Sequence, residues 1–441
     1  MQYLAAWMFL AMSILIMVGF PVTFTLLGTA LTFGLIGFGW NFFNLLPLRI
    51  WGVMNNVTLL AVPLFVFMGV MLERSGLAEE LLDTMGLVFG KVRGGLAVSV
   101  VVVGALLGAS TGIVGATVVT MGLIAIPTML RRGYQKELAT GTVAASGTLG
   151  QIIPPSIILV LLGDIIGVPV GDLFMAAVFP GMVLVVLYVI YIIVVSLIKP
   201  HWAPLIPQEE LDALKSREML IKVGKALFPP LFLIVAVLGS MFAGIASPTE
   251  AASVGAVGAT LLTFLNKRFT YQILREVSYS TMQLTSMVFI ILVGAAAFGL
   301  VFRGTGGDTL VRTFLGGMAH THGKWFVFFI VMFVIFIVGF FLDFIEIVFI
   351  HVPVLAPIII EFGIDPLWFC VILAVNLQTS FLTPPFGFSL FYLKAVTPPE
   401  VETGHIYRGI IPFVVLQLIG LTICVLFPIL STWLPKVVFS N

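Results

Sequence analysis

The sequence NLQTSFLTPPFG, residues 376–387, places two consecutive prolines among Asn, Thr and Ser inside a long apolar stretch. The segment SGTLGQIIPPSI, residues 146–157, repeats that arrangement in the first half of the chain. A double proline removes two amide donors and obstructs the preceding helical turn, so each segment is expected to interrupt a helix. The surrounding stretches, 136–167 and 366–396, are apolar and long enough to cross a bilayer. We therefore expect two discontinuous transmembrane helices.

The composition of the whole chain agrees with insertion into a membrane. Of the 441 residues, 60% are hydrophobic and 9% are charged, with a formal net charge of +1. A soluble domain carries about 25% charged residues, so this composition excludes a water-soluble enzyme, a disordered chain and a nucleic-acid-binding protein. The two cysteines, Cys370 and Cys424, lie in apolar runs without metal-ligand spacing. No P-loop, nucleophile elbow or HExxH motif is present, which argues against ATP-driven transport and against an enzyme.

The few charged residues orient the chain in the membrane. The only long polar stretch, residues 199–225, is interpreted as a cytoplasmic linker between two halves. By the positive-inside rule, threading outward from that linker leaves most basic residues inside. Those outside are Arg49, Arg303, Arg312, Lys324 and Lys436. Both termini then face the outside, and the amphipathic segments 78–90 and 308–319 are expected to lie at the interface.

Two apolar runs, 95–130 and 325–361, are too long for one crossing and too short for two with a loop. Threading places both ends of the first run inside and both ends of the second run outside. Each run is therefore expected to form a re-entrant hairpin, and the two hairpins enter from opposite faces. The middle of the first run, GASTGIVGAT (108–117), is small and polar enough for a tip. The alternative is that its glycines form a small-residue face for helix packing.

The two halves of the chain match at a constant offset. Adding 230 residues pairs Pro127 with Pro357, Gly133 with Gly363, and Pro154-Pro155 with Pro384-Pro385. Each half has five crossings, an odd number, so the second copy is inverted. We therefore expect an all-α polytopic membrane protein with an inverted repeat, residues 1–198 and 226–441, each with five transmembrane helices and one re-entrant hairpin. Inverted repeats with broken helices are typical of secondary transporters, whose sites lie near the midplane.

The helix breaks offer ligands for small ions. Backbone carbonyls freed at the breaks lie near further oxygen groups, those of Ser146, Thr148, Asn376, Thr379, Ser380 and Thr383. Unsatisfied backbone groups at bilayer depth are tolerated where they line a cavity or bind something. These oxygens suit a small cation, and the half-helix N-termini after the prolines favour an anion. The alternative is a pair of proline kinks whose backbone groups are satisfied by neighbouring helices.

Two carboxylates, Asp343 and Glu346, lie near the middle of the second hairpin. A charge at membrane depth is costly, so each is a candidate functional residue. The alternative for either residue is a structural bond to His351 or to a buried amide. Arg303, at the outer end of the apolar stretch 279–302, is a candidate to attract an organic anion, and its alternative role is an interfacial anchor.

At these residues the chain resembles the large membrane subunit of TRAP transporters, the tripartite ATP-independent periplasmic transporters. The resemblance covers essentially the whole chain. It is carried by the two proline segments, by GFFLDFIEI (339–347), by GID (363–365) and by SPTEAASVGA (247–256). It implies an elevator-type secondary transporter of the bacterial inner membrane that is driven by sodium ions and needs no organic cofactor. It also implies import of an organic anion delivered by a periplasmic binding protein, beside a small four-helix membrane subunit.

The resemblance further implies two sodium sites, each between a hairpin and a broken helix. The first would consist of Ser110, Thr111, Gly112 and Thr117 with Ser146, Gly147 and Thr148. The second would consist of Asp343 with Asn376, Thr379, Ser380 and Thr383. The candidate substrate contacts are Pro154, Pro155, Ser156, Pro384, Pro385 and Arg303.

The first hairpin departs from the family pattern at its tip. Ile113 and Val114 stand where family members often carry serines or an aspartate. Either backbone carbonyls supply more of the coordination there, or that site is weakened. Two other functions stay open on the sequence: a stand-alone ion-coupled carboxylate transporter that needs no binding protein, and a passive channel.

Overall fold

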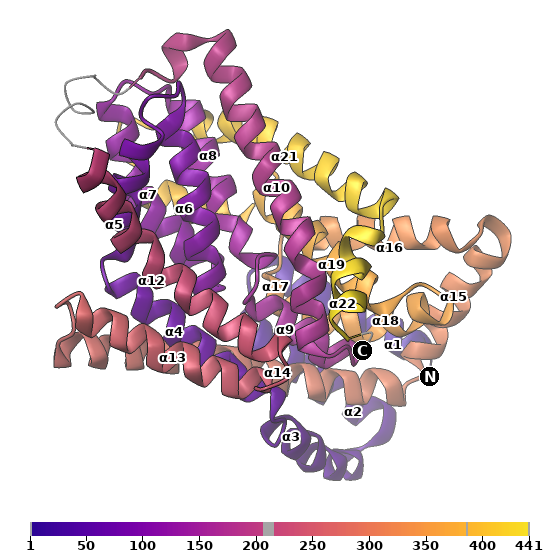
Figure 1. Cartoon of the computed structure of the whole chain (residues 1–441). Coiled ribbons are helices and arrows are strands. Elements are labelled where there is room, and N and C mark those ends of the chain that lie inside the picture. Colours follow the sequence, from indigo (N-terminus) through magenta and orange to yellow (C-terminus); the bar gives the residue numbers. More distant parts are fainter. Residues whose placement is uncertain (1, 206–215, 385–386, 440–441) are drawn as a thin grey trace.

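The computed structural model describes residues 2–205, 216–384 and 387–439, and helices are the only regular elements in this part of the chain (Figure 1). Most helices fall into two groups that pack mainly within themselves. We call these groups the frame helices and the core helices. Two further helices, which we call the arm helices, connect the groups.

The frame helices come from the beginning of each half of the chain. They are α1 (Gln2–Met17), α2 (Val22–Phe38), α3 (Leu46–Met54), α4 (Ala61–Arg74), α12 (Ser216–Phe242), α13 (Pro248–Leu265) and α14 (Tyr271–Gly304), with the short 3-10 helices η1 (Trp40–Leu45) and η2 (Thr58–Leu60) flanking α3. α13 packs on α4 and α12, and α14 packs on α2, α3 and α4. In Figure 1, α13 and α14 run across the lower part of the view, below the upright helices α6, α8 and α10.

The core helices contain both hairpins and both broken helices. From the first half come α6 (Gly95–Thr111), α7 (Val114–Arg131), α8 (Lys136–Thr148), η3 (Leu149–Gln151), α9 (Ile157–Ile166) and α10 (Val170–Ile198), followed by η4 (Pro200–Trp202). From the second half come α16 (Lys324–Val338), α17 (Phe344–Ile350), α18 (Val352–Glu361), α19 (Pro366–Leu382), α20 (Phe388–Val396), α21 (Thr403–Leu426) and α22 (Ile429–Phe439). α8 lies at the centre of this group, because it packs on α6, α7 and α21.

The arm helices are α5 (Leu77–Val88) and α15 (Gly307–His322). They lie where the sequence predicts amphipathic helices. The expected boundary between linker and second half, by contrast, falls inside a helix, because α12 begins at Ser216 and not at residue 226. The segment SREMLIKVGKAL that opens α12 is rich in strong helix formers, so a helix extends into the polar stretch.

One expected crossing is wrong as a single helix. In the stretch 52–72, α3 and α4 are bent by 56° relative to each other. The Oδ1 of Asn56 accepts a hydrogen bond from the Thr58 amide at 3.0 Å, so this side chain competes with helix continuation at the bend. The stretch 406–431, by contrast, contains one helix that is long and apolar enough to span a bilayer, α21; it ends at Leu426, because Pro428 disfavours the helical conformation in Phe427.

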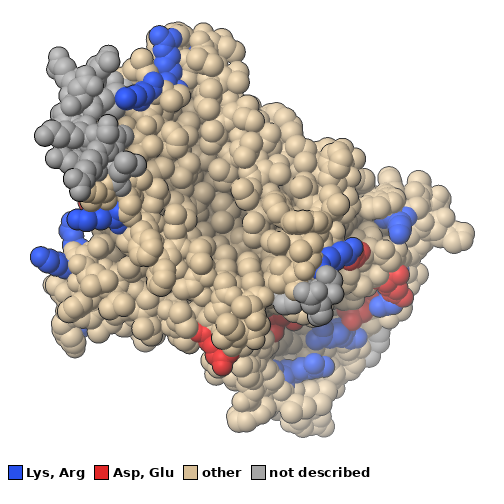
Figure 2. Space-filling view, in the orientation of Figure 1, with Lys and Arg blue, Asp and Glu red and all other residues tan. Residues whose placement is uncertain are grey.

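Helix length and surface charge agree with a polytopic membrane protein. Among the described residues, five helices are long and apolar enough to span a bilayer alone, namely α7, α10, α12 from Ile221, α14 and α21. The bent pairs α3/α4 and α17/α18 raise that number to seven. Figure 2 shows basic side chains near the upper left of this face and a mixture of basic and acidic ones at the lower right, with a broad uncharged band between them.

Candidate ion and substrate site

Hydroxyl groups satisfy part of the backbone at the first helix break. Ser156 is the N-cap residue of α9, and its Oγ donates a hydrogen bond of 2.5 Å to the Gln151 carbonyl. The Thr148 hydroxyl, at the end of α8, donates to the Ala145 carbonyl at 2.9 Å. Both side chains are fully buried. The double proline between them therefore interrupts the helix inside the protein.

The second break has the same construction. The Thr383 hydroxyl donates to the Thr379 carbonyl at 2.8 Å, and the Ser389 hydroxyl reaches back to the Phe381 carbonyl at 2.8 Å. Thr379 itself donates to the Val375 carbonyl at 2.8 Å. The hydroxyl oxygens of both breaks keep lone pairs that can face a cation.

The first hairpin rests directly on the first break. A Cβ built on Gly108 would lie 2.6 Å from the Cα of Gly150, and one built on Gly150 would lie 2.5 Å from the Cα of Gly108. One turn earlier on the hairpin, Gly104 faces Ser146 in the same manner, at 2.6 Å from the Ser146 Cβ. Only glycine permits this approach of two backbones, so these residues fix the hairpin against the break.

The second hairpin rests on the second break at equivalent positions. A Cβ on Gly339 would lie 2.0 Å from the Ser380 Oγ. The Asn376 side chain donates from Nδ2 to the Met332 carbonyl of α16 at 2.9 Å. The Phe344 and Phe381 rings lie 6.4 Å apart at their centroids. The turn that carries Asp343 is thereby held against the end of α19.

The two broken helices meet at residues that are one repeat apart. The Nε2 of Gln378 donates to the Oγ1 of Thr148 at 3.4 Å, and these residues are separated by 230 positions. Both side chains are fully buried. The two breaks therefore share one polar contact at the centre of the core helices.

Only part of the first set of candidate sodium ligands lies together at the tip of the first hairpin. The Thr111 and Thr117 hydroxyl oxygens lie 2.7 Å apart, and Gly112 has a φ of +62° that suits the turn between α6 and α7. The Ser110 side chain lies outside the described part of the chain. Ser146 bonds to the Val143 carbonyl at 3.1 Å, and Gly147 packs against Val118. These last two residues face the flanks of the hairpin.

In the second candidate set, Asp343 is the N-cap residue of α17. Its Oδ1 accepts a hydrogen bond of 2.8 Å from the Phe344 amide. Glu346 reaches back and accepts from the Asp343 amide at 3.1 Å, which completes a capping box. The structural alternative, a bond to an amide, is thus realised for both carboxylates. His351 lies elsewhere, with its ring edge-on to Phe9 at 5.6 Å.

Asp343 also lines a cavity of about 350 Å³ between the two hairpin tips, the two half-helices after the breaks and the frame. Its lining is otherwise almost entirely apolar: Val62, Val66, Ile113, Val114, Gly115, Ala116, Val119, Ile157, Leu284, Met287, Val288, Phe344, Ile345, Phe381, Phe388 and Tyr392. We call this space the central cavity. Among its described lining residues, Asp343 is the single carboxylate.

Tyr392 of α20 is a lining residue that the sequence reasoning missed. Its ring lies against hairpin 1, where a Cβ on Gly115 would be 3.2 Å from the Tyr392 Cε2. The offset of 230 pairs Tyr392 with Leu162, so one half carries a phenol where the other carries an aliphatic side chain. This difference between the two halves is the sequence feature that could have identified Tyr392.

The candidate substrate residues lie in separate regions, at the helix breaks and in a second cavity. Pro154, Pro155 and Ser156 are buried, and Pro384 is half-buried at the second break. Pro385 lies outside the described residues. Arg303 is exposed and lines a separate cavity of about 440 Å³, apart from the central cavity.

A family model described as "Tripartite ATP-independent periplasmic transporter, DctM component" matches residues 9–430. The chain belongs to the TRAP transporter large permease family. The permease is 33% identical over 396 residues to the C4-dicarboxylate TRAP transporter large permease protein DctM of Pseudomonas aeruginosa, with 89% of each chain covered. It is 29% identical to the ectoine/5-hydroxyectoine TRAP transporter large permease protein UehC of Ruegeria pomeroyi, over 99% of this chain and 100% of that relative.

A sialic acid TRAP transporter large permease protein of Vibrio cholerae is 29% identical to the permease, with 96% of each chain covered. Among solved structures, the YdaH transporter of Alcanivorax borkumensis matches with a TM-score of 0.62 at 15% identity, over 89% of the permease and 87% of that chain. At this identity the match concerns the fold alone. It agrees with an all-α polytopic membrane architecture.

Proposed function

We propose that the permease imports a small organic anion by sodium-coupled secondary transport, through an elevator movement of the core helices against the frame helices. The observation that supports this most directly is the central cavity. It places one carboxylate, Asp343, among the hairpin tips and the half-helices after the breaks. The sodium ligands would be Asp343 with oxygens of Asn376, Thr379, Ser380 and Thr383, and in the first half Thr111 and Thr117 with the break at Thr148.

Charge and solvation support a cation beside Asp343. Asp343 accepts one backbone hydrogen bond, from Phe344, and lines an otherwise apolar cavity; a bound sodium ion would offset the desolvation cost that remains. Neutralising Asp343 with sodium also prepares the cavity for an anion, because the negative charge that would repel it is then compensated. The two ions would thus bind together, which is the requirement for coupled transport.

Helix bounds support the proposed inverted repeat. α4 and α14 end at residues 74 and 304, α7 and α18 at 131 and 361, and α9 and α20 at 166 and 396. Each pair differs by 230. The linker between the repeats, near residues 199–215, is proposed to be cytoplasmic, as the positive-inside rule requires.

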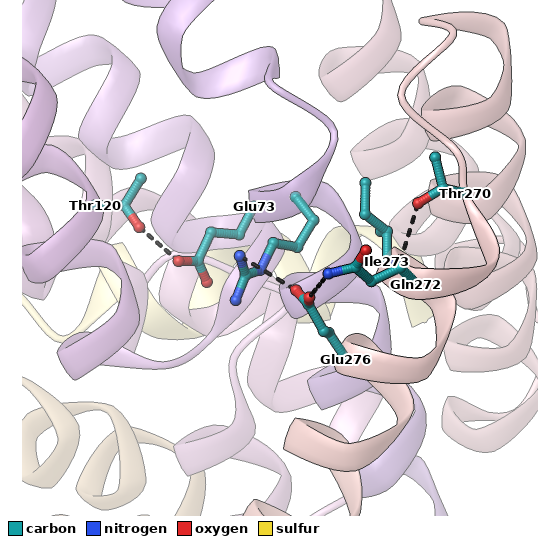
Figure 3. Close-up of polar contacts among 7 residues, drawn as sticks. Glu73, Thr120, Thr270, Gln272, Ile273 and Glu276 are labelled. Atoms are coloured by element: carbon teal, nitrogen blue, oxygen red, sulfur yellow. Dashed lines mark hydrogen bonds and ion pairs between the residues drawn. The ribbon is translucent and has the colours of Figure 1, made fainter.

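Few polar side-chain bonds join the frame to the core, as an elevator movement requires. Figure 3 shows one of them: the Thr120 hydroxyl of α7 donates to the Glu73 Oε1 of α4 at 2.7 Å. The neighbouring Arg74 instead pairs with Glu276 inside the frame, at 3.6 Å. Glu73 therefore bonds across the seam between the groups, and Arg74 stabilises the frame itself.

Thr120→Val is expected to speed exchange of the core between its positions, because it removes this bond while preserving the shape of the side chain. A hydrogen bond to a charged group contributes about 1.5–3 kcal/mol, and partial exposure reduces that here, so uptake should rise by up to about 10-fold if movement limits the rate. The measurement is initial uptake into proteoliposomes. Thr128→Val is the matched control, since its hydroxyl bonds only within α7, to the Ile124 carbonyl at 2.8 Å. Equal uptake rates for Thr120→Val and Thr128→Val would contradict the role proposed for the bond between Thr120 and Glu73.

Relatives in the family are named for C4-dicarboxylate, ectoine and sialic acid transport. We propose a small carboxylate as the substrate of this permease, because a cavity of about 350 Å³ accommodates a molecule of that size. We further propose that it works in the bacterial inner membrane with a small four-helix membrane subunit and a periplasmic binding protein.

Reconstituted uptake tests this function. The permease, its small subunit and its binding protein are placed in proteoliposomes and offered succinate, sialic acid, a 2-oxo acid and glutamate. Accumulation of one of them with an inward sodium gradient, and none with potassium, is the expected result. Accumulation without the binding protein would favour the stand-alone transporter. Equilibration without accumulation, independent of sodium, would favour the channel.

A further inference from the structure

A second cavity lies between the frame helices α3 and α14 and the core helix α9. Its volume is about 440 Å³, and Arg49, Asn56, Asp164 and Arg303 supply its polar lining. We call it the outer recess. Threading by the positive-inside rule places Arg49 and Arg303 on the outer side of the membrane.

Two elements, α9 and α14, line both cavities in succession. On α14, Val288 belongs to the central cavity and Leu292, one turn on, to the outer recess. On α9, Ile157 lines the central cavity, and Asp164 lines the outer recess seven residues later. That spacing corresponds to about two helical turns, or roughly 10 Å. The two cavities therefore follow one another between frame and core.

The arginines of the outer recess have no carboxylate partner in the part of the chain that the structure describes. Neither Arg49 nor Arg303 forms a salt bridge there, although Asp308 interacts with Arg303 at longer range. The nearby Asp164 is occupied differently, since its Oδ1 accepts a hydrogen bond of 2.7 Å from the Asn56 Nδ2. Arg49 and Arg303 thus line the recess beside one carboxylate, Asp164, with Asp308 at longer range from Arg303.

We propose that the outer recess is an anion-binding station that holds a carboxylate before it enters the central cavity. This inference rests on the proposed function, and it adds a second site for the same substrate. A guanidinium binds a carboxylate through two parallel hydrogen bonds. The two arginines outnumber the one carboxylate that lines the recess, and a local excess of positive charge raises the concentration of anions. Both arginines are exposed, so binding is weak and sensitive to salt, as suits a station that must release its ligand.

The Asn56–Asp164 hydrogen bond would act as a gate beside the anion site proposed in the outer recess. Asn56 belongs to the frame and Asp164 to the core, and both line the outer recess, so the bond joins frame and core in the wall of that recess. Its opening is required for the core to move away from the frame. An anion held by Arg49 and Arg303 would lie beside this bond, on the outer side of the seam.

The first experiment measures uptake in proteoliposomes with Arg49→Gln, Arg303→Gln and the double variant. The expected result is a fall in kcat/KM of about 10-fold at low ionic strength, which shrinks at high salt, while kcat and sodium dependence are unchanged. Lys436→Gln is the control, because it removes an exposed outer cation away from the recess. An unchanged kcat/KM in the double variant would overturn the proposal.

The second experiment measures binding without transport, so it stands even if the proposed function fails. Radiolabelled succinate is titrated onto the permease carrying Asp343→Asn in phosphatidylcholine nanodiscs. Weak, salt-sensitive binding that disappears in the Arg49→Gln/Arg303→Gln background is expected. A parallel titration uses nanodiscs containing phosphatidylglycerol. If that lipid, and not succinate, binds in an arginine-dependent manner, the recess holds a lipid headgroup and the proposal is overturned.

Discussion

Asp343→Asn is expected to abolish sodium-dependent uptake. The variant removes the only carboxylate among the described residues of the central cavity and keeps the shape of the side chain. Because the charge of Asp343 is proposed to hold sodium, its loss should lower sodium affinity by at least about 100-fold, the upper end of what losing a supporting partner costs a metal site. Uptake driven by a sodium gradient, measured with the substrate that the reconstitution identifies, reports the effect.

Asparagine is also a good N-cap residue, so Asp343→Asn removes the charge and preserves the cap of α17. Asp343→Ala, which removes the cap as well, should lower both uptake and thermal stability. Glu346→Gln is the matched control, since Glu346 does not line the central cavity and the amide oxygen of Gln still accepts from the Asp343 backbone. Normal sodium dependence in a well-folded Asp343→Asn protein would refute the proposed site.

Gly150→Ala is expected to destabilise the permease and to abolish transport. The added methyl group would lie 2.5 Å from the Cα of Gly108 and 2.6 Å from its carbonyl oxygen, so backbone must move to admit it. Overpacking of a core costs about 1–3 kcal/mol, and here the displaced atoms belong to the hairpin tip beside the candidate ion site. Thermal denaturation in detergent and initial uptake measure the two effects.

Gly171→Ala on α10 provides the comparison, because no atom lies within 4 Å of its added methyl group. That variant should retain both the stability and the uptake of the unsubstituted protein. If Gly150→Ala behaved like Gly171→Ala, the close contact between hairpin and break would have no role in holding the site.

The helix breaks were accessible from sequence because their signal is local: a double proline ends a helix wherever it stands. The charges at both ends of the apolar run 95–130 predict that this hairpin begins and ends on one side of the membrane. Glycines at Gly108 and Gly150 were visible as small residues. The contact between Gly108 and Gly150 was not visible, because a sequence gives the spacing of residues along the chain and not which surfaces pack together.

What depends on the three-dimensional arrangement could not be predicted. Tyr392 reaches the central cavity because α20 of the second half packs on α7 of the first. Arg303 lies in the outer recess with Arg49, although more than half the chain separates the two residues, so spacing along the sequence could not bring them together. The start of α12 was placed too late because charged residues with high helix propensity resemble a linker in composition.

The glycine contacts between the hairpins and the helix breaks affect how precisely the geometry of the proposed ion site is held. Where Gly108 meets Gly150, main chain touches main chain with no rotatable side chain between them. The separation of hairpin and break is then set by peptide bond lengths and van der Waals radii, which hardly vary with temperature or lipid. The ion site proposed at this contact would keep its radius while the rest of the molecule changed shape, and a fixed radius would help it to distinguish a small cation from a larger one.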